Sequence, residues 1–419
     1  MVITFVVDMI GATNNGTTVT AMRTAEILKK HGHVVRFIAF VPKDHSDLTN
    51  FDIFGVDTKL NFGIFNPLID DNGMYLAKLS NDDFPRIRKF LEGSDIVHLM
   101  MPFKLEMQVR LVAKAMGIPV SSAMHVQPEN VSYNIKMGHS HLINSIIYAL
   151  FNTWMYHYIQ NIHTPSMMMK DQMIKHHYRN DIFPISNGVS SKFVPTPTQK
   201  PDNLKDKFVI LMIGRLSGEK RQDLIIKAIG KSKFNGDIQL ILCGQGPKKK
   251  AYTKLSEKYL KNPVIYKFVP QEELLKIINY CDLYIHASDA ESEAISCIEA
   301  FSCGKVPVIS DSKLSATNHF ALDERCLFKA GNYKSLMERI EYFYQHREVL
   351  AQLGPKYSEY GKTFDLDTCV FKLEKMFVKA IADDKADKAN HRAYYTSFRE
   401  RRRLRKVSKK AGIDHPLVY

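Results

Sequence analysis

The sequence predicts an α/β protein with two parallel sheets of similar size, joined by one linker. Short apolar runs alternate with helical patterns through the first 190 residues, and the same alternation restarts at residue 208. Between these regions, residues 195–207 hold three prolines among polar and charged residues, a composition typical of linkers. Strands that alternate with helices indicate parallel sheets. A length of 419 residues agrees with two or three domains.

The first half opens with an apolar run at residues 2–9, which predicts the first strand. A loop rich in glycine, asparagine and threonine extends to Thr18, and a helical pattern covers residues 21–30. Later apolar runs, which end at polar residues or prolines, predict strands at 31–40, 94–102, 118–125 and 158–166. We therefore expect a first domain over residues 1–190.

The second half repeats this rhythm. Apolar runs predict strands at 208–216, 238–247, 264–270, 281–288 and 306–310. Helical patterns cover 223–231, 251–261, 295–304 and much of 334–381. We expect a linker at 191–207, a second domain at 208–365, a C-terminal helix at 366–384 and a basic tail at 385–419.

The composition excludes several classes of protein. Hydrophobic residues make up 45% and charged residues 24%, as in ordinary globular proteins rather than disordered or fibrous ones. Apolar runs are too short to span a membrane, and the N-terminal run reaches Asp8 without the basic region of a signal peptide. The six cysteines show no CxxC or zinc-ligand spacing, so we expect buried thiols in a reducing compartment and no structural zinc.

The first candidate site is the segment Gly214–Lys220, GRLSGEK, which follows a predicted strand and precedes a helix. A strand-to-helix turn lies at the carboxyl edge of a parallel sheet, where α/β proteins bind ligands. Arg215 and Lys220 can converge there on one diphosphate, Arg through its planar fork and Lys as a point charge. The alternative is a solvated basic loop.

The second candidate site is DAESEAISCIEA, which contains Glu291 and Glu299. We expect a helix to start near Glu293, so that the first amides, at Ala294, Ile295 and Ser296, form an anion site. Glu299 could then hydrogen-bond a ribose and Glu291 a sugar hydroxyl. The alternative is that both carboxylates are solvated charges at the end of a helix.

These motifs carry a family resemblance. GRLSGEK, then GQGP, then ESEAISCIEA ahead of CGKVPVIS, together with SNGV at 186–189, resemble the retaining nucleotide-sugar glycosyltransferases of glycosyltransferase family 4. The resemblance extends to about residue 380. It implies a GT-B fold, in which two Rossmann-like domains face each other across a cleft and C-terminal helices cross back to the first domain. It implies a nucleotide sugar as co-substrate, with no cofactor and no metal.

The resemblance also assigns residues. His125 and Glu291 would act at the reacting sugar, and whether Glu291 is a nucleophile or a positioning group stays open, with positioning favoured. Ser292, Glu293 and Ala294 replace glycines that are usual in the family. The positions that would bind the nucleotide sugar are Gly16, Arg215, Lys220, Ala294, Ile295 and Glu299.

The net charge of +14 indicates an anionic partner, and most of it lies near the C-terminus. Residues 385–410 hold eleven basic and two acidic residues, interleaved with Tyr394, Tyr395, Phe398, Leu404 and Val407. This pattern favours an anionic membrane surface. A disordered solubilising tail is one alternative, and a contact with RNA is another, although no nucleic-acid-binding motif accompanies the tail and no nucleic acid is expected.

Two further segments bear on the acceptor. Residues 137–163 form an aromatic-rich helical stretch with few charges and the only tryptophan, Trp154, which suits either an interfacial face or a core helix. Residues 125–134 resemble the acceptor-side segment of bacterial glycolipid-forming members of the family, which would place Gln127, Glu129 and Asn130 at the acceptor.

The sequence therefore predicts a retaining hexosyltransferase, cytoplasmic and peripheral on the inner face of the cell membrane. It would transfer a hexose from a nucleotide sugar, expected to be a UDP-hexose, to a membrane lipid such as diacylglycerol or a glycosyl-diacylglycerol. The alternatives are the same chemistry on a soluble sugar or cell-envelope glycan precursor, or a non-catalytic protein that binds a nucleotide sugar or RNA.

Overall fold

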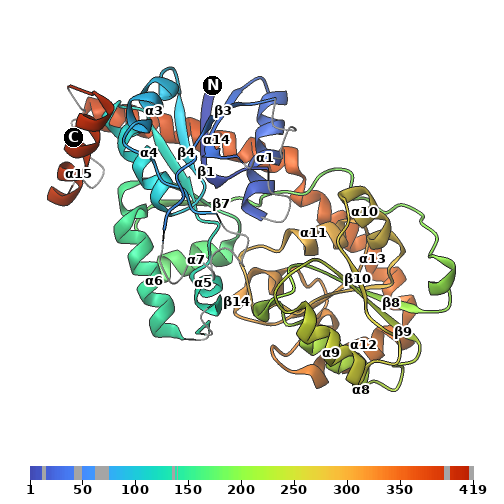
Figure 1. The fold of residues 1–419 in the computed structure, drawn as a ribbon. Coiled ribbons are helices and arrows are strands. Elements are labelled where there is room, and N and C mark those ends of the chain that lie inside the picture. Colours follow the sequence, from blue (N-terminus) through green and yellow to red (C-terminus); the bar gives the residue numbers. More distant parts are fainter. Residues whose placement is uncertain are drawn as a thin grey trace. The chain divides into compact units, whose positions relative to one another are not determined.

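The computed structural model describes residues 1–11, 16–41, 50–61, 75–134, 137–138, 140–390 and 397–414 (Figure 1). The chain divides into two compact units. Unit 1 comprises Met1–Pro128, Ser140–Asn187 and Asp367–Tyr419, and unit 2 comprises Glu129–His139 and Gly188–Leu366. The last helices therefore return to the first unit, as the predicted fold requires. Part of the predicted glycine-rich loop, residues 12–15, and the tail residues Tyr394 and Tyr395 lie outside the described residues.

Unit 1 is built on a parallel sheet with the order β3-β2-β1-β4-β5-β6-β7. Six consecutive residues of β1 are buried, as expected for a strand that is covered on both faces of a parallel sheet. The strands of this sheet are β1 Val2–Met9, β2 Val34–Phe40, β3 Asp52–Gly55, β4 Ile96–Leu99, β5 Val120–Ala123, β6 Asn161–Thr164 and β7 Asp181–Pro184.

Helices flank this sheet, and α5 (Pro128–Asn134) begins at the boundary between the units. Most bury one apolar stripe, as α3 does with Phe84, Ile87 and Leu91. The other helices of unit 1 are α1 Gly16–Lys30, α3 Asp83–Leu91, α4 Lys104–Ala115, α6 His141–Trp154, α7 Met167–Lys175, α14 Leu366–Ala389 and α15 Phe398–Ala411.

Unit 2 has a second parallel sheet, with the order β10-β9-β8-β11-β13-β15. Its strands are β8 Phe208–Ile213, β9 Ile238–Cys243, β10 Ile265–Lys267, β11 Leu283–His286, β13 Pro307–Ser310 and β15 Leu327–Phe328, and a separate pair joins β12 Ala290–Glu291 to β14 Leu314–Ser315. Its helices are α8 Gln222–Lys231, α9 Lys249–Tyr259, α10 Gln271–Tyr280, α11 Ile295–Ser302, α12 Tyr333–Gln345 and α13 Arg347–Gly361.

The two sheets share one topology. Counted within its own unit, each runs 3-2-1-4-5-6, and unit 1 adds a seventh strand at the edge. This is the Rossmann order. Strands 2 and 3 are added on one side of strand 1 and strands 4 to 6 on its other side, so the strand order reverses between the neighbouring strands 1 and 4. The predicted fold of two Rossmann-like α/β units is confirmed. The edge strands β3, β7 and β15 were not expected from the sequence.

The apolar core of unit 2 extends into the predicted linker. Phe193 and Leu204 are both buried in this core, and the amide of Thr196 donates to Oδ1 of Asn279 at 2.8 Å. All six cysteines are free and buried, which confirms the prediction of buried thiols. In the part of the chain that the structure describes, no helix is both long and apolar enough to cross a membrane.

The basic segment near the C-terminus forms a helix that packs on unit 1, so a disordered tail is wrong for residues 398–411. Helix α15 lies against α3 and α4 (Figure 1). Its only acidic residue, Glu400, is fully buried and pairs with the buried Arg110 of α4 at 2.6 Å. The Arg110 guanidinium also lies 4.9 Å from the centre of the Tyr158 ring. One buried ion pair therefore anchors a helix whose outer face is cationic.

Replacing Glu400 with Ala should destabilise unit 1 strongly, because it leaves Arg110 buried without its partner. Loss of one member of a buried ion pair costs about 3–5 kcal/mol. Urea unfolding monitored by the fluorescence of Trp154, which is in unit 1, measures the effect. The control is Glu359→Ala, which removes an exposed ion pair with Lys362 and should leave the midpoint unchanged. Equal effects of the two substitutions would contradict the anchoring role of Glu400.

Candidate functional site

The predicted site residues of unit 2 gather where the strand order reverses. Strands β8 and β11 are neighbours in the sheet, and their following loops connect to elements on opposite sides. Arg215 and Lys220 lie on the loop after β8, whereas Glu291 lies on β12, just after β11. The two predicted motifs are therefore adjacent at the carboxyl edge of the sheet, which is where this topology forms a ligand crevice.

Two glycines of GQGP hold the neighbouring loop against the Arg215 loop. A side chain at Gly244 would come within 2.1 Å of the Gly214 carbonyl oxygen, and one at Gly246 within 2.4 Å of the Leu216 carbonyl oxygen. The Leu216 amide in turn donates to the Gln245 carbonyl at 2.9 Å. The two glycines of GQGP therefore allow the two backbones to pack closely beside the site. This role does not require the third glycine of a dinucleotide-binding motif.

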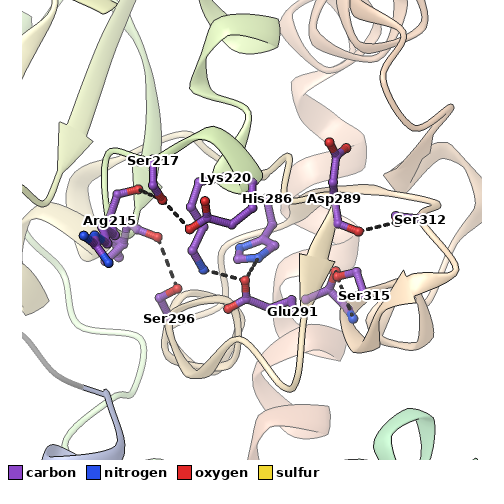
Figure 2. A network of polar contacts seen from close by, with 12 residues as sticks. Arg215, Ser217, Lys220, His286, Asp289, Glu291, Ser296, Ser312 and Ser315 are labelled. Atoms are coloured by element: carbon purple, nitrogen blue, oxygen red, sulfur yellow. Dashed lines mark hydrogen bonds and ion pairs between the residues drawn. The ribbon is translucent and has the colours of Figure 1, made fainter. Parts of the chain in front are cut away.

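Lys220 and Glu291 contact each other directly (Figure 2). The Lys220 Nζ lies 2.5 Å from Oε2 of Glu291, and both side chains are largely buried. Nε2 of the fully buried His286 lies 3.8 Å from the same oxygen, beyond hydrogen-bond distance. Burial raises the pKa of Glu291, but the Lys220 charge and the nearby His286 outweigh it and lower the pKa to about 2. Glu291 is therefore ionised at neutral pH.

Asp289 joins several segments behind this pair. Its Oδ2 accepts from Nη1 of Arg221 at 2.9 Å and from the hydroxyl of Tyr133 at 3.1 Å. Its amide donates to the Glu219 carbonyl at 2.8 Å, and its own carbonyl accepts from Oγ of Ser312 (Figure 2). A single buried carboxylate therefore ties the loop after β8 to the loop after β11.

Helix α11 begins two residues later than predicted. It starts at Ile295 rather than near Glu293, because Ala294 adopts a left-handed backbone with φ 68° and ψ 65° and caps the helix from outside. The Ala294 carbonyl accepts the amide of Cys297 at 2.9 Å. The amides of Ile295 and Ser296 donate to no residue that the structure describes, so they remain available at the mouth of the crevice.

Side chains of α11 tie this helix to the sheet. Oγ of Ser296 donates to the Ile213 carbonyl at the end of β8, at 3.2 Å, and accepts from the hydroxyl of Tyr284 at 3.2 Å. Glu299 is buried one turn further along. Arg215 is partly buried, which lowers the pKa of its guanidinium, and nearby Glu219 partly offsets the effect.

The remaining predicted residues lie on other elements. Gly16 is the exposed first residue of α1, and His125 and Gln127 follow β5 in unit 1. Glu129 and Asn130 lie on α5 and group with unit 2. Gln127 and Glu129 are buried, and Asn130 is partly exposed.

The partly buried His125 belongs to a cluster of imidazoles with the buried His98 and His163, which the sequence did not predict. Its ring lies 5.3 Å from that of His163, and the ring of His163 lies 6.4 Å from that of His98. Burial lowers the pKa of His125 to about 3, with a further contribution from His163. Its Nε2 has no hydrogen-bond partner among the described residues. A neutral imidazole with an unused nitrogen can bind a ligand hydroxyl.

Sequence reasoning missed Asp289, Arg221, His286 and Tyr133. Asp289 and His286 carried a usable signal, because polar residues at the end of a buried strand lie at the ligand edge of the sheet. Arg221 was overlooked beside Lys220, although it is one of the few residues other than glycine with a left-handed backbone (φ 55°). Tyr133 carried no signal, because its partner is 156 residues away.

Comparison with known proteins agrees with this fold. A family model described as Glycosyltransferase Family 4 matches residues 14–193, and one described as Glycosyl transferases group 1 matches residues 196–361. The matches cover unit 2 from the predicted linker to the end of α13 and most of unit 1 before it.

Solved structures and a curated relative extend the comparison. Anabaena HepE in complex with UDP and glucose superposes with a TM-score of 0.69 at 15% identity, over 90% of this chain and 99% of HepE. The catalytic domain of cholesterol-α-glucosyltransferase from Helicobacter pylori is 43% identical over 38% of this chain and 98% of that domain, with a TM-score of 0.36.

The phosphatidylinositol N-acetylglucosaminyltransferase GPI3 subunit of Saccharomyces cerevisiae is 33% identical over 112 residues, which are 26% of this chain. The match spans only 25% of the yeast chain.

The fold and the crevice define a GT-B glycosyltransferase with two α/β units. The two family models place the chain within that class: it belongs to glycosyltransferase family 4.

The ion pair of Glu291 with Lys220 should make the free energy of unfolding decrease at acid pH. The pKa is about 2 in the folded chain against an ordinary 4.5, so the charged form stabilises the fold above about pH 4.5. This contribution, up to about 3 kcal/mol, should be lost as the pH falls from about 4.5 towards 2. Urea unfolding of the native protein and Glu291→Gln from about pH 3 to 7 measures it. The exposed Glu257 of α9 provides the control variant, Glu257→Gln.

In that series, the stability difference between the native protein and Glu291→Gln should shrink as the pH falls below 4.5. A difference that stays constant over the whole range would contradict the depressed pKa of Glu291.

Replacing Ala294 with glycine should stabilise the fold, and replacing it with valine should destabilise it. An L-residue in the left-handed region costs about 1–2 kcal/mol, whereas glycine has no Cβ to clash. Ala294→Gly should raise the free energy of unfolding by up to about 1 kcal/mol, less than the full strain because glycine also loosens the unfolded chain. Ala294→Val should lower it. A loss of stability in the glycine variant would show that the left-handed turn is not strained.

Proposed function

We propose that this chain is a retaining glycosyltransferase that moves a hexose from a nucleotide sugar, UDP-hexose, to a membrane lipid. The observation that carries the proposal is the Lys220–Glu291 pair at the switch point of unit 2, beside unpaired amides of α11. Cations and amides suit a diphosphate, and an ionised carboxylate suits a sugar hydroxyl. HepE, which has the same fold, was solved with UDP and glucose.

The donor would bind in unit 2. Arg215, Lys220 and the amides of Ala294 and Ile295 would hold the diphosphate, and the buried Glu299 would hold the ribose. As the bond between the anomeric carbon and the phosphate oxygen breaks, negative charge develops on the diphosphate and positive charge on the sugar ring. Preorganised cations and helix amides stabilise the leaving group without rearranging during the reaction.

Glu291 would position the sugar. In the proposed reaction, the acceptor oxygen bonds to the anomeric carbon on the face that the diphosphate leaves, and its proton passes to a phosphate oxygen. Glu291 accepts hydroxyl hydrogen bonds and, being ionised, stabilises the positive ring. Once a diphosphate arrives, Lys220 can exchange the Glu291 carboxylate for a phosphate, which frees Glu291 for the sugar.

The acceptor side would belong mainly to the segment after β5. His125, with its unused Nε2, would contact the donor sugar, and Gly16 would let the backbone of the first loop approach the phosphate. Gln127, Glu129 and Asn130 would line the acceptor. We assign the acceptor to residues 1–190 and the donor to residues 208–365.

A lipid acceptor is supported by the outer surface of α6. Leu142, Ile146, Leu150 and Trp154 recur every four residues and are all exposed, Leu142 by 70% and Leu150 by 58%. Four apolar side chains in one row along an exposed helix suit an interfacial position in a membrane. This favours the interfacial interpretation of residues 137–163 over a core helix.

The comparisons support a lipid without identifying it. The yeast protein that matches 112 residues is, by its name, a transferase to phosphatidylinositol rather than diacylglycerol. A lipid acceptor would place the protein peripherally, on the inner face of the cell membrane.

Product mass spectrometry tests the proposal. The protein is incubated with UDP-glucose, UDP-galactose, UDP-N-acetylglucosamine or GDP-mannose on anionic vesicles that contain diacylglycerol, phosphatidylinositol or a sterol. One donor should yield a hexosylated lipid. Arg215→Ala/Lys220→Ala should reduce its rate by about a hundredfold or more, because both charges act on the leaving group. Lys250→Ala/Lys254→Ala, which removes two exposed cations of α9, is the matched control.

The other outcomes are equally informative. Slow release of free sugar without a lipid product would keep the transferase and redirect the search to soluble sugars or glycan precursors. Binding of nucleotide sugars without any turnover would instead favour a non-catalytic binding protein. An equal loss of rate in the α9 control would overturn the roles of Arg215 and Lys220.

A further inference from the structure

A pocket of about 800 Å³ lies in unit 1, and none of the residues assigned to the donor is part of its lining. Its walls come from the loop before α4, the end of α6 and the start of α15. Such a volume suits a ligand of the size of a lipid headgroup with part of its chains. The apolar residues among its lining are Leu60, Pro102, Phe103, Leu150, Phe151 and Trp154.

Three cations stand at this pocket without an acidic partner. Lys104, Arg399 and Arg403 line it, and none forms an ion pair with a carboxylate in the described chain. The one acid of α15, Glu400, is already paired with Arg110. Burial lowers the pKa of Lys104, and the surrounding positive charges lower it further, Arg403 most strongly and then Lys406, Lys78 and Lys410.

The ring of Trp154 lies close to two of these cations. The Lys104 Nζ is 5.3 Å and the Arg403 guanidinium carbon 5.5 Å from the indole ring. The ring offsets part of their repulsion, since cations are attracted to the faces of aromatic rings. It supplies no net negative charge, so the pocket remains an unneutralised cationic site with an apolar wall.

We propose that this pocket binds an anionic membrane phospholipid, with the phosphate among Lys104, Arg399 and Arg403 and the acyl chains against Leu150 and Phe151. Charge complementarity indicates the anion. Continuity with the exposed row of α6, which ends in Leu150 and Trp154, indicates that the ligand arrives from a membrane. Phe398, 84% exposed, directly precedes the pocket-lining Arg399 at the start of α15.

The bound phospholipid would hold unit 1 at the membrane without being the acceptor of the reaction. Burial is the main cause of the lowered Lys104 pKa, and neutralising the cluster would remove the repulsion that adds to it. The inference goes beyond the proposed transfer, because binding can be measured with neither donor nor turnover. A negative transferase assay would therefore not count against phospholipid binding, and a negative binding experiment would not count against the transferase activity.

The only tryptophan of the chain lies in this pocket, so its fluorescence reports on the pocket alone. The full chain is titrated with short-chain phosphatidylglycerol below its critical micelle concentration. We expect a saturable blue shift of the Trp154 emission. Phosphatidylcholine of the same chain length, which has no net charge, should bind about tenfold more weakly, and inorganic phosphate should produce no shift.

Variants show which residues form the binding site. Their binding is measured by calorimetry rather than by fluorescence, because substitutions in the pocket change the surroundings of Trp154. Lys104→Ala/Arg403→Ala should weaken phosphatidylglycerol binding by about tenfold or more. Arg401→Ala/Arg402→Ala removes the same charge from α15 at positions that do not line the pocket, and should have little effect. Leu150→Gln, at an exposed position, should weaken binding by removing an acyl contact. Far-UV circular dichroism checks that each variant is folded.

Four results would overturn the proposal. They are no shift with phosphatidylglycerol, equal binding of phosphatidylcholine, a full shift with inorganic phosphate alone, and equal losses in the two double variants. A full shift with inorganic phosphate would indicate a site for free phosphate. Equal losses in the two double variants would indicate a diffuse electrostatic attraction.

Discussion

The candidate site depends on one topological constraint, the reversal of strand order between β8 and β11. Because all the strands of the sheet are parallel, their loops leave at the same edge. Because the order reverses, the loops after these two strands diverge and leave a crevice. Side chains that are far apart in sequence therefore meet there. Lys220 and Glu291, 71 residues apart, form the ion pair on which the proposed chemistry is built.

Burial decides what this ion pair can do. A buried carboxylate would take up a proton if it were alone. The charge of Lys220 keeps Glu291 ionised, and Asp289 holds the loops that carry both residues. The site is thus charged but internally neutralised before a ligand arrives. A diphosphate ligand brings its own negative charge and competes with Glu291 for Lys220.

Much of the fold and part of the site could be predicted from sequence, for identifiable reasons. Long apolar strands such as β1 and β8 leave a clear pattern, and GRLSGEK and ESEAISCIEA stand directly behind such strands. The Asp289–Tyr133 contact could not be predicted, because it depends on how α5 folds over a distant loop. The start of α11 was placed too early because the left-handed turn at Ala294 has no glycine to mark it. The helix α15 was overlooked, although a lone glutamate in an arginine-rich helical segment is a signal for a buried partner.

The close approach at Gly244 and Gly246 has a consequence for anyone who wishes to redesign donor preference. The residues of greatest interest, Arg215 and Lys220, are on a loop whose backbone rests against these two glycines. A side chain at Gly244 would displace the Gly214 carbonyl and one at Gly246 the Leu216 carbonyl, and either would shift the loop that carries Arg215 and Lys220. A library that varies the crevice must therefore keep both glycines constant and can diversify Gln245, whose side chain is exposed.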